Sequence, residues 1–213
     1  MITTAISKFN LFTMNDDSNI RKGTIFIVDI SGYTKFVRET KSSTGAWAIA
    51  QLLEVLLSAN GLGFKISEIE GDAILFYMYG KPYPVKKLLQ QFSRMLLAFN
   101  EKLEEIRLVE DRVDQLSIKA VVHYGEITEY RVSRFSKLYG EILNEAHRLL
   151  KNHIHLNTYI LITHNYINEF PKHDLPIFCG VQQCEKYDLG KLCYTYYPYN
   201  DILKKNHRLA LVS

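Results

Sequence analysis

The segment Thr24–Ile30 constrains the fold of this chain more than any other, because it is apolar or β-branched at every position except Asp29. A continuous run of this kind is typical of a central strand that is covered on both faces of its sheet. Ser31-Gly32 interrupts the run, and residues 33–39 read as the start of a helix. The chain must therefore supply helices or strands on both sides of one buried strand.

The remaining periodicities predict alternating helices and strands. We expect helices at 45–59, 85–107, 141–152 and 164–170, strands at 62–69, 73–79 and 157–163, a strand pair 115–122 and 126–132 bent at Tyr124-Gly125, and a hairpin of 177–187 with 191–197. The order βααβ–βαβ, followed by further pieces of both kinds, indicates an α+β fold in which helices pack on one sheet.

Composition restricts the class of protein. An apolar fraction of 47% with 23% charged residues excludes a disordered chain. The net charge of +3 is too small for nucleic acid to be the main partner. The first 22 residues lack the apolar block of a signal peptide, and no apolar run reaches the roughly 18 residues of a spanning helix. We expect a soluble cytoplasmic protein with no membrane partner.

Three cysteines, Cys179, Cys184 and Cys193, lie near the C-terminus. An odd number of cysteines in a protein expected to be cytoplasmic favours reduced thiols over a disulfide framework.

Two acidic residues stand where strands stop or turn. Asp29 is near the end of the first strand, and Asp72 is at the tip of a hairpin around Glu70-Gly71-Asp72. If the two strands are neighbours, both carboxylates face one cleft, where their repulsion is relieved by protonation or by a cation. Carboxylate oxygens select Mg²⁺, Mn²⁺ or Ca²⁺. Taken singly, each aspartate is more often a turn or capping residue.

The segments around these acids resemble a known family. Val28–Phe36 resembles the first metal motif of the class III nucleotidyl cyclases, and Ile69–Ala73 resembles their second, with Asp72 the expected 43 positions after Asp29. Leu138–Leu149 resembles the helix that carries their catalytic Asn and Arg. The resemblance covers about residues 24–198 and is greatest to an uncharacterised bacterial branch.

The resemblance implies a ferredoxin-like class III cyclase sandwich with a mixed, mostly antiparallel sheet. It implies a lead-in segment at 1–22, a nucleotidyl cyclase-like domain at 23–200 and a tail at 201–213. Two Mg²⁺ or Mn²⁺ ions would be held by Asp29, Asp72 and the carbonyl of Ile30. The amides of the next four residues would lie near the triphosphate, where a helix start favours anions. These residues are Ser31, Gly32, Tyr33 and Thr34.

The resemblance also implies the reaction and the assembly. The ribose 3′-oxygen of a nucleoside triphosphate would attack the α-phosphate and release pyrophosphate. Asn144 would orient the ribose, Arg148 would offset charge at the reacting phosphate, and Lys186, or its rival Lys191, would contact the triphosphate. In the family one subunit supplies the metals and the other supplies Asn and Arg, so a homodimer is implied.

The base-reading positions depart from the adenylate cyclase pattern. Glu68 stands where guanylate cyclases have Glu, and a carboxylate accepts from the N1 and N2 donors of guanine. Lys137 fits neither pattern: it would read a carbonyl, including that of a pyrimidine, or contact phosphate, or lie on the surface. The short loop 129–136 leaves Arg131 and Arg134 without an assigned role. These departures keep two alternatives open, which are an inactive nucleotide-binding relative and a purely structural domain.

Overall fold

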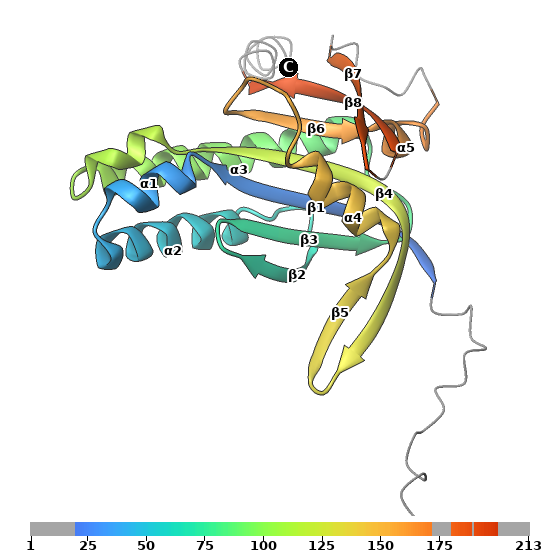
Figure 1. Cartoon of the computed structure of the whole chain (residues 1–213), viewed down its shortest axis with the longest axis horizontal. Coiled ribbons are helices and arrows are strands. Elements are labelled where there is room, and N and C mark those ends of the chain that lie inside the picture. Colours follow the sequence, from blue (N-terminus) through green and yellow to red (C-terminus); the bar gives the residue numbers. More distant parts are fainter. Residues whose placement is uncertain (1–19, 172–179, 189, 200–213) are drawn as a thin grey trace, which may run out of the picture.

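The computed structural model describes residues 20–171, 180–188 and 190–199. The elements alternate along the chain as expected for an α+β protein (Figure 1). They are β1 (Arg21–Ser31), α1 (Tyr33–Glu39), α2 (Ser42–Ser58), β2 (Lys65–Glu70), β3 (Ala73–Tyr79), α3 (Val85–Arg107), the 3₁₀ helix η2 (Asp111–Gln115), β4 (Ser117–Val132), β5 (Phe135–Tyr139), α4 (Glu141–Leu149), β6 (Tyr159–Thr163), α5 (His164–Ile167), β7 (Val181–Tyr187) and β8 (Gly190–Pro198).

One mixed sheet organises the fold. Its strands lie in the order β2-β3-β1-β4-β6-β8-β7, and β5 pairs with β4 outside this path. All pairs are antiparallel except β4 with β6. The expectation of a mostly antiparallel sheet with helices packed on it is confirmed.

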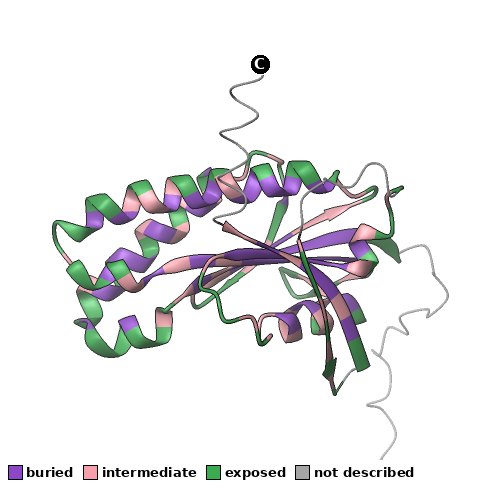
Figure 2. Ribbon diagram, turned by 90° about the horizontal axis from the view of Figure 1, so that it is seen from above, coloured by how far each residue is buried: buried purple, intermediate pink, exposed green. Residues whose placement is uncertain are grey.

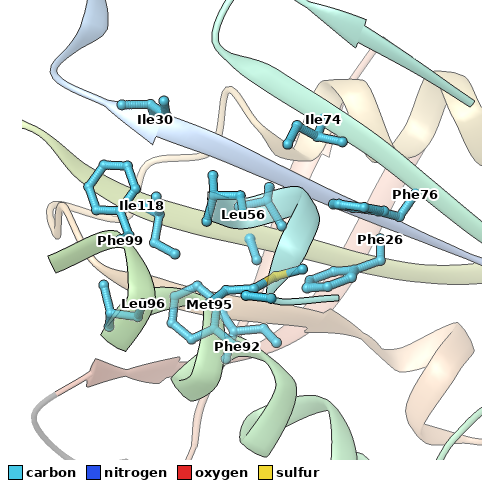
Figure 3. Close-up of a cluster of buried hydrophobic side chains, with 14 of the residues drawn as sticks. Phe26, Ile30, Leu56, Ile74, Phe76, Phe92, Met95, Leu96, Phe99 and Ile118 are labelled. Carbon is cyan, nitrogen blue, oxygen red and sulfur yellow. The ribbon is translucent and has the colours of Figure 1, made fainter. Parts of the chain in front are cut away.

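Strand β1 lies between β3 and β4 and is covered on both faces, as its composition predicts. Phe26, Val28 and Ile30 join the larger core with α2 and α3 (Figure 3), and Ile25 and Ile27 join a second core with α4. In Figure 1, α4 lies in front of the sheet and α3 behind it. Because side chains alternate along a strand, Asp29 shares the face of Ile25 and Ile27 and lies on the side of α4.

The buried residues lie between the sheet and its two helix layers (Figure 2). Helix α3 shows why such a layer forms: Leu88, Phe92, Met95 and Phe99 recur at helical spacing and are fully buried. Burying one large apolar side chain contributes about 1.5–3 kcal/mol, so this face attaches α3 firmly to the sheet.

The expected division into two strands at Tyr124-Gly125 is wrong, although β4 curves as it leaves the sheet (Figure 1). β4 runs unbroken through both residues, because it stays paired with β1 from Ser117 to Ile127. The predicted partner strand is instead the distal half of β4, which continues past the sheet and pairs with β5. The segment 129–136, expected to be a loop, is thus mostly the β4–β5 hairpin.

The expectation of reduced thiols is also wrong for two cysteines. Cys184 and Cys193 are directly opposite on β7 and β8 and form a disulfide, with their Cα atoms 4.0 Å apart. The odd count misled because pairing is decided by strand register, which the count does not contain. Cys179 lies outside the described residues.

Several boundaries differ by a few residues. β1 begins at Arg21, so the expected lead-in segment overlaps the first strand. α4 ends at Leu149 and α5 at Ile167, earlier than expected. Residues 1–19 and 201–213, which hold most of the lead-in and the whole tail, lie outside the described part. No helix within the described part is long and apolar enough to cross a membrane.

Candidate functional site

Strand pairing brings Asp29 and Asp72 together. Asp29 lies opposite Ala73 in the β1–β3 ladder, and the Ile30 N–H donates to the carbonyl oxygen of Asp72 over 3.2 Å. Gly71, with a φ of 59°, makes the turn between β2 and β3 that sets Asp72 at the strand start. Both aspartates line a cavity of about 840 Å³ and a second of about 300 Å³.

The electrostatics of this pair favour a bound cation. Burial raises the pKa of Asp72, and the charge of Asp29 raises it further, to about 6. Asp29 is partly compensated, because Lys119 Nζ is 3.2 Å from its Oδ2. A divalent ion between the carboxylates would remove the remaining repulsion.

The residues of this site therefore fit a hard divalent cation, although they supply few ligands to it. Among the described residues, no group of three or more His, Cys, Asp or Glu side chains could hold a metal ion. The acidic side chains that line both cavities are Asp29 and Asp72, and two carboxylates suit Mg²⁺ or Mn²⁺ completed by water or phosphate. The role expected for the Ile30 carbonyl stays a prediction.

The segment Ser31–Thr34 links the metal strand to α1. Gly32 has a φ of 89°, and a Cβ there would meet the carbonyl oxygen of Gln115 at 2.5 Å, so this turn requires glycine. Thr34 lines the larger cavity, whereas Tyr33 turns to a separate groove between α1 and α2. Only one of the two side chains thus faces the candidate site.

Helix α4 brings its expected residues to the same cavity. Asn144 and Arg148 line it together with His147, at the i, i+3 and i+4 positions of one helix face. Arg148 forms an ion pair with Asp188, in the turn between β7 and β8. In this chain the aspartates and the Asn/Arg pair line one cavity, so their assignment to different subunits stays a prediction.

A buried histidine fastens α4 to the sheet. His123 on β4 is 1% exposed, and its Nε2 lies 2.5 Å from Glu145 Oε2. Its Nδ1 lies 2.8 Å from Thr163 Oγ1 on β6. Because a carboxylate only accepts, Nε2 donates to Glu145 and the rotation of α4 is fixed next to Asn144.

The two candidate base-reading residues contact each other. The Lys137 ammonium donates to the Glu68 carboxylate, and this bond raises the pKa of Lys137. Glu68 lines the smaller cavity, beside Asp72. Lys137 therefore lies next to the expected site rather than alone on the surface.

The remaining expected contacts are not brought to the site. Lys186 is exposed on β7 opposite Lys191, and neither lines the two cavities. Arg131 and Arg134 are exposed on the β4–β5 hairpin and line neither cavity. A phosphate contact by Lys186 stays a prediction.

Three polar residues of the larger cavity escaped the sequence analysis: Lys119, His147 and Lys151. Lys119 had a usable signal, since it is the one charge in the apolar run from Ile118 to Val122. A lysine in a strand buried on both faces needs a partner, and Asp29 is its neighbour in the β1–β4 ladder. Lys151 had no such signal, because it follows the end of α4 in an exposed segment.

A family model with the description "Protein of unknown function (DUF2652)" matches residues 49–159, more than half of the chain. The chain belongs to this family. The segment shared with DUF2652 runs from within α2 to the start of β6. It includes Asp72, Lys119, Asn144 and Arg148, while Asp29 precedes it.

A protein of Mycobacterium tuberculosis, described as uncharacterized, is 33% identical to this DUF2652 chain over 122 residues. The match covers 54% of this chain and 57% of that protein. The chain thus spans little more than half the length of this relative.

Solved structures establish the fold. The guanylyl cyclase Cya2 superposes with a TM-score of 0.67 at 16% identity, covering 85% of this chain and 96% of Cya2. The adenylyl cyclase CyaB from P. aeruginosa superposes with a TM-score of 0.59 at 17% identity, covering 84% of this chain and 94% of CyaB. The guanylate cyclase domain of RhGC from Catenaria anguillulae, in complex with GTP, superposes with a TM-score of 0.55 at 18% identity. The match covers 83% of this chain and 95% of that domain. This DUF2652 chain has the class III cyclase-type fold.

Proposed function

We propose that this chain is a nucleotidyl cyclase, which converts a nucleoside triphosphate into a 3′,5′-cyclic nucleotide and pyrophosphate. The observation that carries the proposal is the single cavity of about 840 Å³ lined by Asp29, Asp72, Asn144 and Arg148. Metal acids and the Asn/Arg pair, separated by more than 70 residues of sequence, are the combination that the reaction needs.

The roles follow from the chemistry of each side chain. Asp29 and Asp72 would hold Mg²⁺ or Mn²⁺, which supplies charge stabilisation at the triphosphate oxygens. The Asn144 amide would orient the ribose, and Arg148 would leave Asp188 to neutralise charge at the reacting phosphate. The 3′-oxygen then bonds to the α-phosphorus as the bond to the pyrophosphate oxygen breaks.

Glu68 and Lys137 together favour guanine. A base that displaces their mutual contact must offer donors to the carboxylate and an acceptor to the ammonium. Guanine offers N1–H and N2–H beside O6, which satisfies both groups at once. Uracil also has an N–H donor beside a carbonyl acceptor, but over a shorter edge, so it is the second candidate base.

Two observations favour the alternative of an inactive nucleotide-binding relative. Lys119 already supplies a positive charge to Asp29, and Asp188 already engages Arg148. Such a protein would bind a nucleoside triphosphate without turning it over.

The deciding experiment is incubation with each of the four ribonucleoside triphosphates and Mn²⁺, with mass detection of cyclic product. We expect cyclic GMP to form fastest, and we expect Asp72→Asn and Asn144→Ala to abolish it. Asp111→Asn, which removes an exposed acid in η2, is the matched control and should leave the rate unchanged. Binding of nucleotide without any cyclic product would establish the alternative.

A further inference from the structure

The disulfide between Cys184 and Cys193 lies at an open edge of the sheet (Figure 1). Strand β7 is the last strand in the order, and its described partner is β8 alone. Cys184 on this edge strand is exposed, and Cys193 is partly exposed. A thiolate from solution can therefore reach the disulfide while the protein stays folded, which is the condition for rapid thiol–disulfide exchange.

Two lysines accompany the disulfide on the same face of the hairpin. Because side chains alternate along a strand, Lys186 shares the face of Cys184. Lys191 is directly opposite Lys186 and shares the face of Cys193. Both lysines are exposed. Their charges attract an anionic thiol and stabilise the thiolate that leaves when the disulfide opens.

The acid nearest in sequence points away from the disulfide. Glu185 lies on the opposite face of β7, where its side chain is 8% exposed. Its carboxylate accepts hydrogen bonds from the hydroxyls of Tyr187 and Tyr194 and from Nδ1 of His153. The positive charge of the two lysines is therefore not offset on the face that carries the sulfurs.

The disulfide also closes a ring around the turn that holds Arg148. Asp188 lies in the turn between the two cysteines and forms the ion pair with Arg148 of α4. Closing a short ring restricts the chain within it, so the intact disulfide limits how far Asp188 can move from Arg148. Opening the disulfide removes that limit, while β8 keeps its ladder with β6.

From this combination we infer that the Cys184–Cys193 disulfide is a thiol-exchange site, which a dithiol reductant opens in the folded protein. A thiolate of the reductant attacks Sγ of Cys184, and Cys193 leaves as a thiolate beside Lys191. The second thiol of the reductant then breaks the mixed disulfide at Cys184. Two electrons and two protons pass from the dithiol to the two cysteines, and the reductant becomes a disulfide.

Under the proposed function, the exchange has a direction. In the closed hairpin Asp188 holds the guanidinium that would stabilise the reacting phosphate, and in the open hairpin it holds this group less tightly. Reduction should therefore raise the rate of cyclisation in the parent. It should not raise the rate in Asp188→Asn, where Arg148 is released in both redox states. This consequence rests on the proposed function, whereas the exchange itself does not.

Reduction of the folded full chain by dithiothreitol, at neutral pH and without denaturant, tests the exchange site. Samples are quenched with acid and alkylated, and peptide fragmentation spectra distinguish Cys184 and Cys193 from Cys179. We expect both cysteines to become alkylated at a rate that rises in proportion to the dithiothreitol concentration. A rate that levels off at high concentration would mean that the fold must open first, and it would overturn the inference. Absence of reduction would overturn it as well.

Charge variants test the two lysines. Lys186→Gln combined with Lys191→Gln should slow reduction by mercaptoethanesulfonate, which attacks with two negative charges, about tenfold. Reduction by mercaptoethanol, which attacks with one, should slow less. The matched control is Lys35→Gln combined with Lys41→Gln, which removes two exposed lysines in and beside α1, remote from β7 (Figure 1). Equal slowing in the two pairs would overturn the role of the lysines.

Hydrogen exchange tests whether the disulfide restrains the hairpin. On reduction the amides of β7 should exchange about tenfold faster or more, and those of the central strand β1 should not change. Cys184→Ser combined with Cys193→Ser should show the faster exchange without reductant. Unchanged exchange in β7 would overturn the restraint on Asp188. Because none of these measurements depends on turnover, failure here is distinct from failure of the proposed function.

Discussion

At the residue scale, the charge balance between Asp29 and Asp72 is the central property of the candidate site. Asp29 has Lys119 at 3.2 Å, and no cationic side chain forms an ion pair with Asp72 among the described residues. Burial raises the pKa of Asp72, and the nearby charge of Asp29 raises it further. An imbalance of this kind is what a cation-binding pair shows before the cation arrives.

This imbalance predicts a pH dependence of stability in the metal-free protein. The pKa of Asp72 is about 6 in the folded state against 3.8 in the unfolded state, so the folded state binds the proton more tightly. Its favourable contribution is present below pH 4 and is lost as the pH rises through 6. With a chelator present, Asp72→Asn should match the parent at pH 4 and exceed its unfolding free energy by about 1–2 kcal/mol at pH 7, after allowance for solvent screening.

Urea titrations at several pH values measure this difference. Asp111→Asn, the control, should track the parent at every pH. Mn²⁺ should raise the melting temperature of the parent and not that of Asp72→Asn, because only the parent keeps both ligands. A constant difference between Asp72→Asn and the parent from pH 4 to 7 would contradict a pKa of Asp72 raised by burial and by the charge of Asp29.

Gly32 makes a second prediction at this scale. Its φ of 89° excludes any side chain, and so does the Gln115 carbonyl oxygen, which would lie 2.5 Å from a Cβ at this position. Gly32→Ala should lower the unfolding free energy by about 2–4 kcal/mol, from backbone strain and the clash together. Gly63→Ala is the matched control, because Gly63 also has a positive φ of 69° but no atom within 4 Å of its Cβ position. It should cost about 1–2 kcal/mol. Denaturant melts measure both variants, and an equal loss of unfolding free energy in Gly32→Ala and Gly63→Ala would contradict the steric clash at Gly32.

Much of the site was predictable from local sequence, and the reason is physical. Asp29 and Asp72 each end or begin a strand, and adjacent antiparallel strands bring such ends together. The contact between Glu68 and Lys137 was not predictable, because it depends on where the β4–β5 hairpin lies relative to β2. The pairing of Lys119 with Asp29 likewise depends on a register set over the full length of β1 and β4.

At the scale of elements, α4 depends on one buried contact for its position. Ile142, Ala146 and Leu149 pack on the sheet, and the polar contact of Glu145 with His123 selects one rotation of the helix. Apolar packing alone tolerates small rotations, whereas a hydrogen bond to a 1% exposed imidazole does not.

Removing the Glu145 carboxylate tests this dependence. Glu145→Ala leaves a buried imidazole N–H unpaired and should lower the unfolding free energy by about 1–3 kcal/mol. Under the proposed function it should also reduce kcat more than it raises KM, because Asn144 and Arg148 lose their alignment. Glu145→Gln keeps an acceptor and should recover most of both losses. Denaturant melts and initial rates measure the two effects, and equal damage in both variants would show that charge rather than position is at stake.

Periodicity predicted the helices and strands correctly where packing is regular. The predictions were wrong where pairing between distant residues decides the structure. The runs of β1 and α3 predicted their own burial. The long β4 was divided because Gly125 suggested a turn, yet Gly125 pairs with Gly23 on β1 and the ladder continues to Ile127. Pairing of distant residues overrides a local turn signal.

At the scale of the whole molecule, the β4–β5 hairpin carries a group of exposed apolar side chains. It projects from the sheet (Figure 1), and Tyr130, Val132, Phe135 and Tyr139 on it are between 45% and 70% exposed. The neighbouring edge strand β2 exposes Ile66 and Ile69. Apolar side chains gathered in this way mark an interaction surface. If the chain forms the homodimer that its sequence resemblance implies, this apolar surface is suited to the contact between the two copies.

We therefore expect the chain to sediment at twice its 24.7 kDa mass at micromolar concentration, with the hairpin in the contact. The paired substitution Phe135→Asp with Tyr139→Asp places two charges on that surface and should shift the protein to monomer, because a desolvated unpaired charge opposes association. Leu108→Asp is the control, since Leu108 is 88% exposed at the end of α3, away from the hairpin, and should leave the mass unchanged. Sedimentation velocity across a concentration series separates these cases. A parent that stays monomeric throughout would contradict the expected dimer, and cyclic product formed by that monomer would mean that the four cavity residues act within one chain.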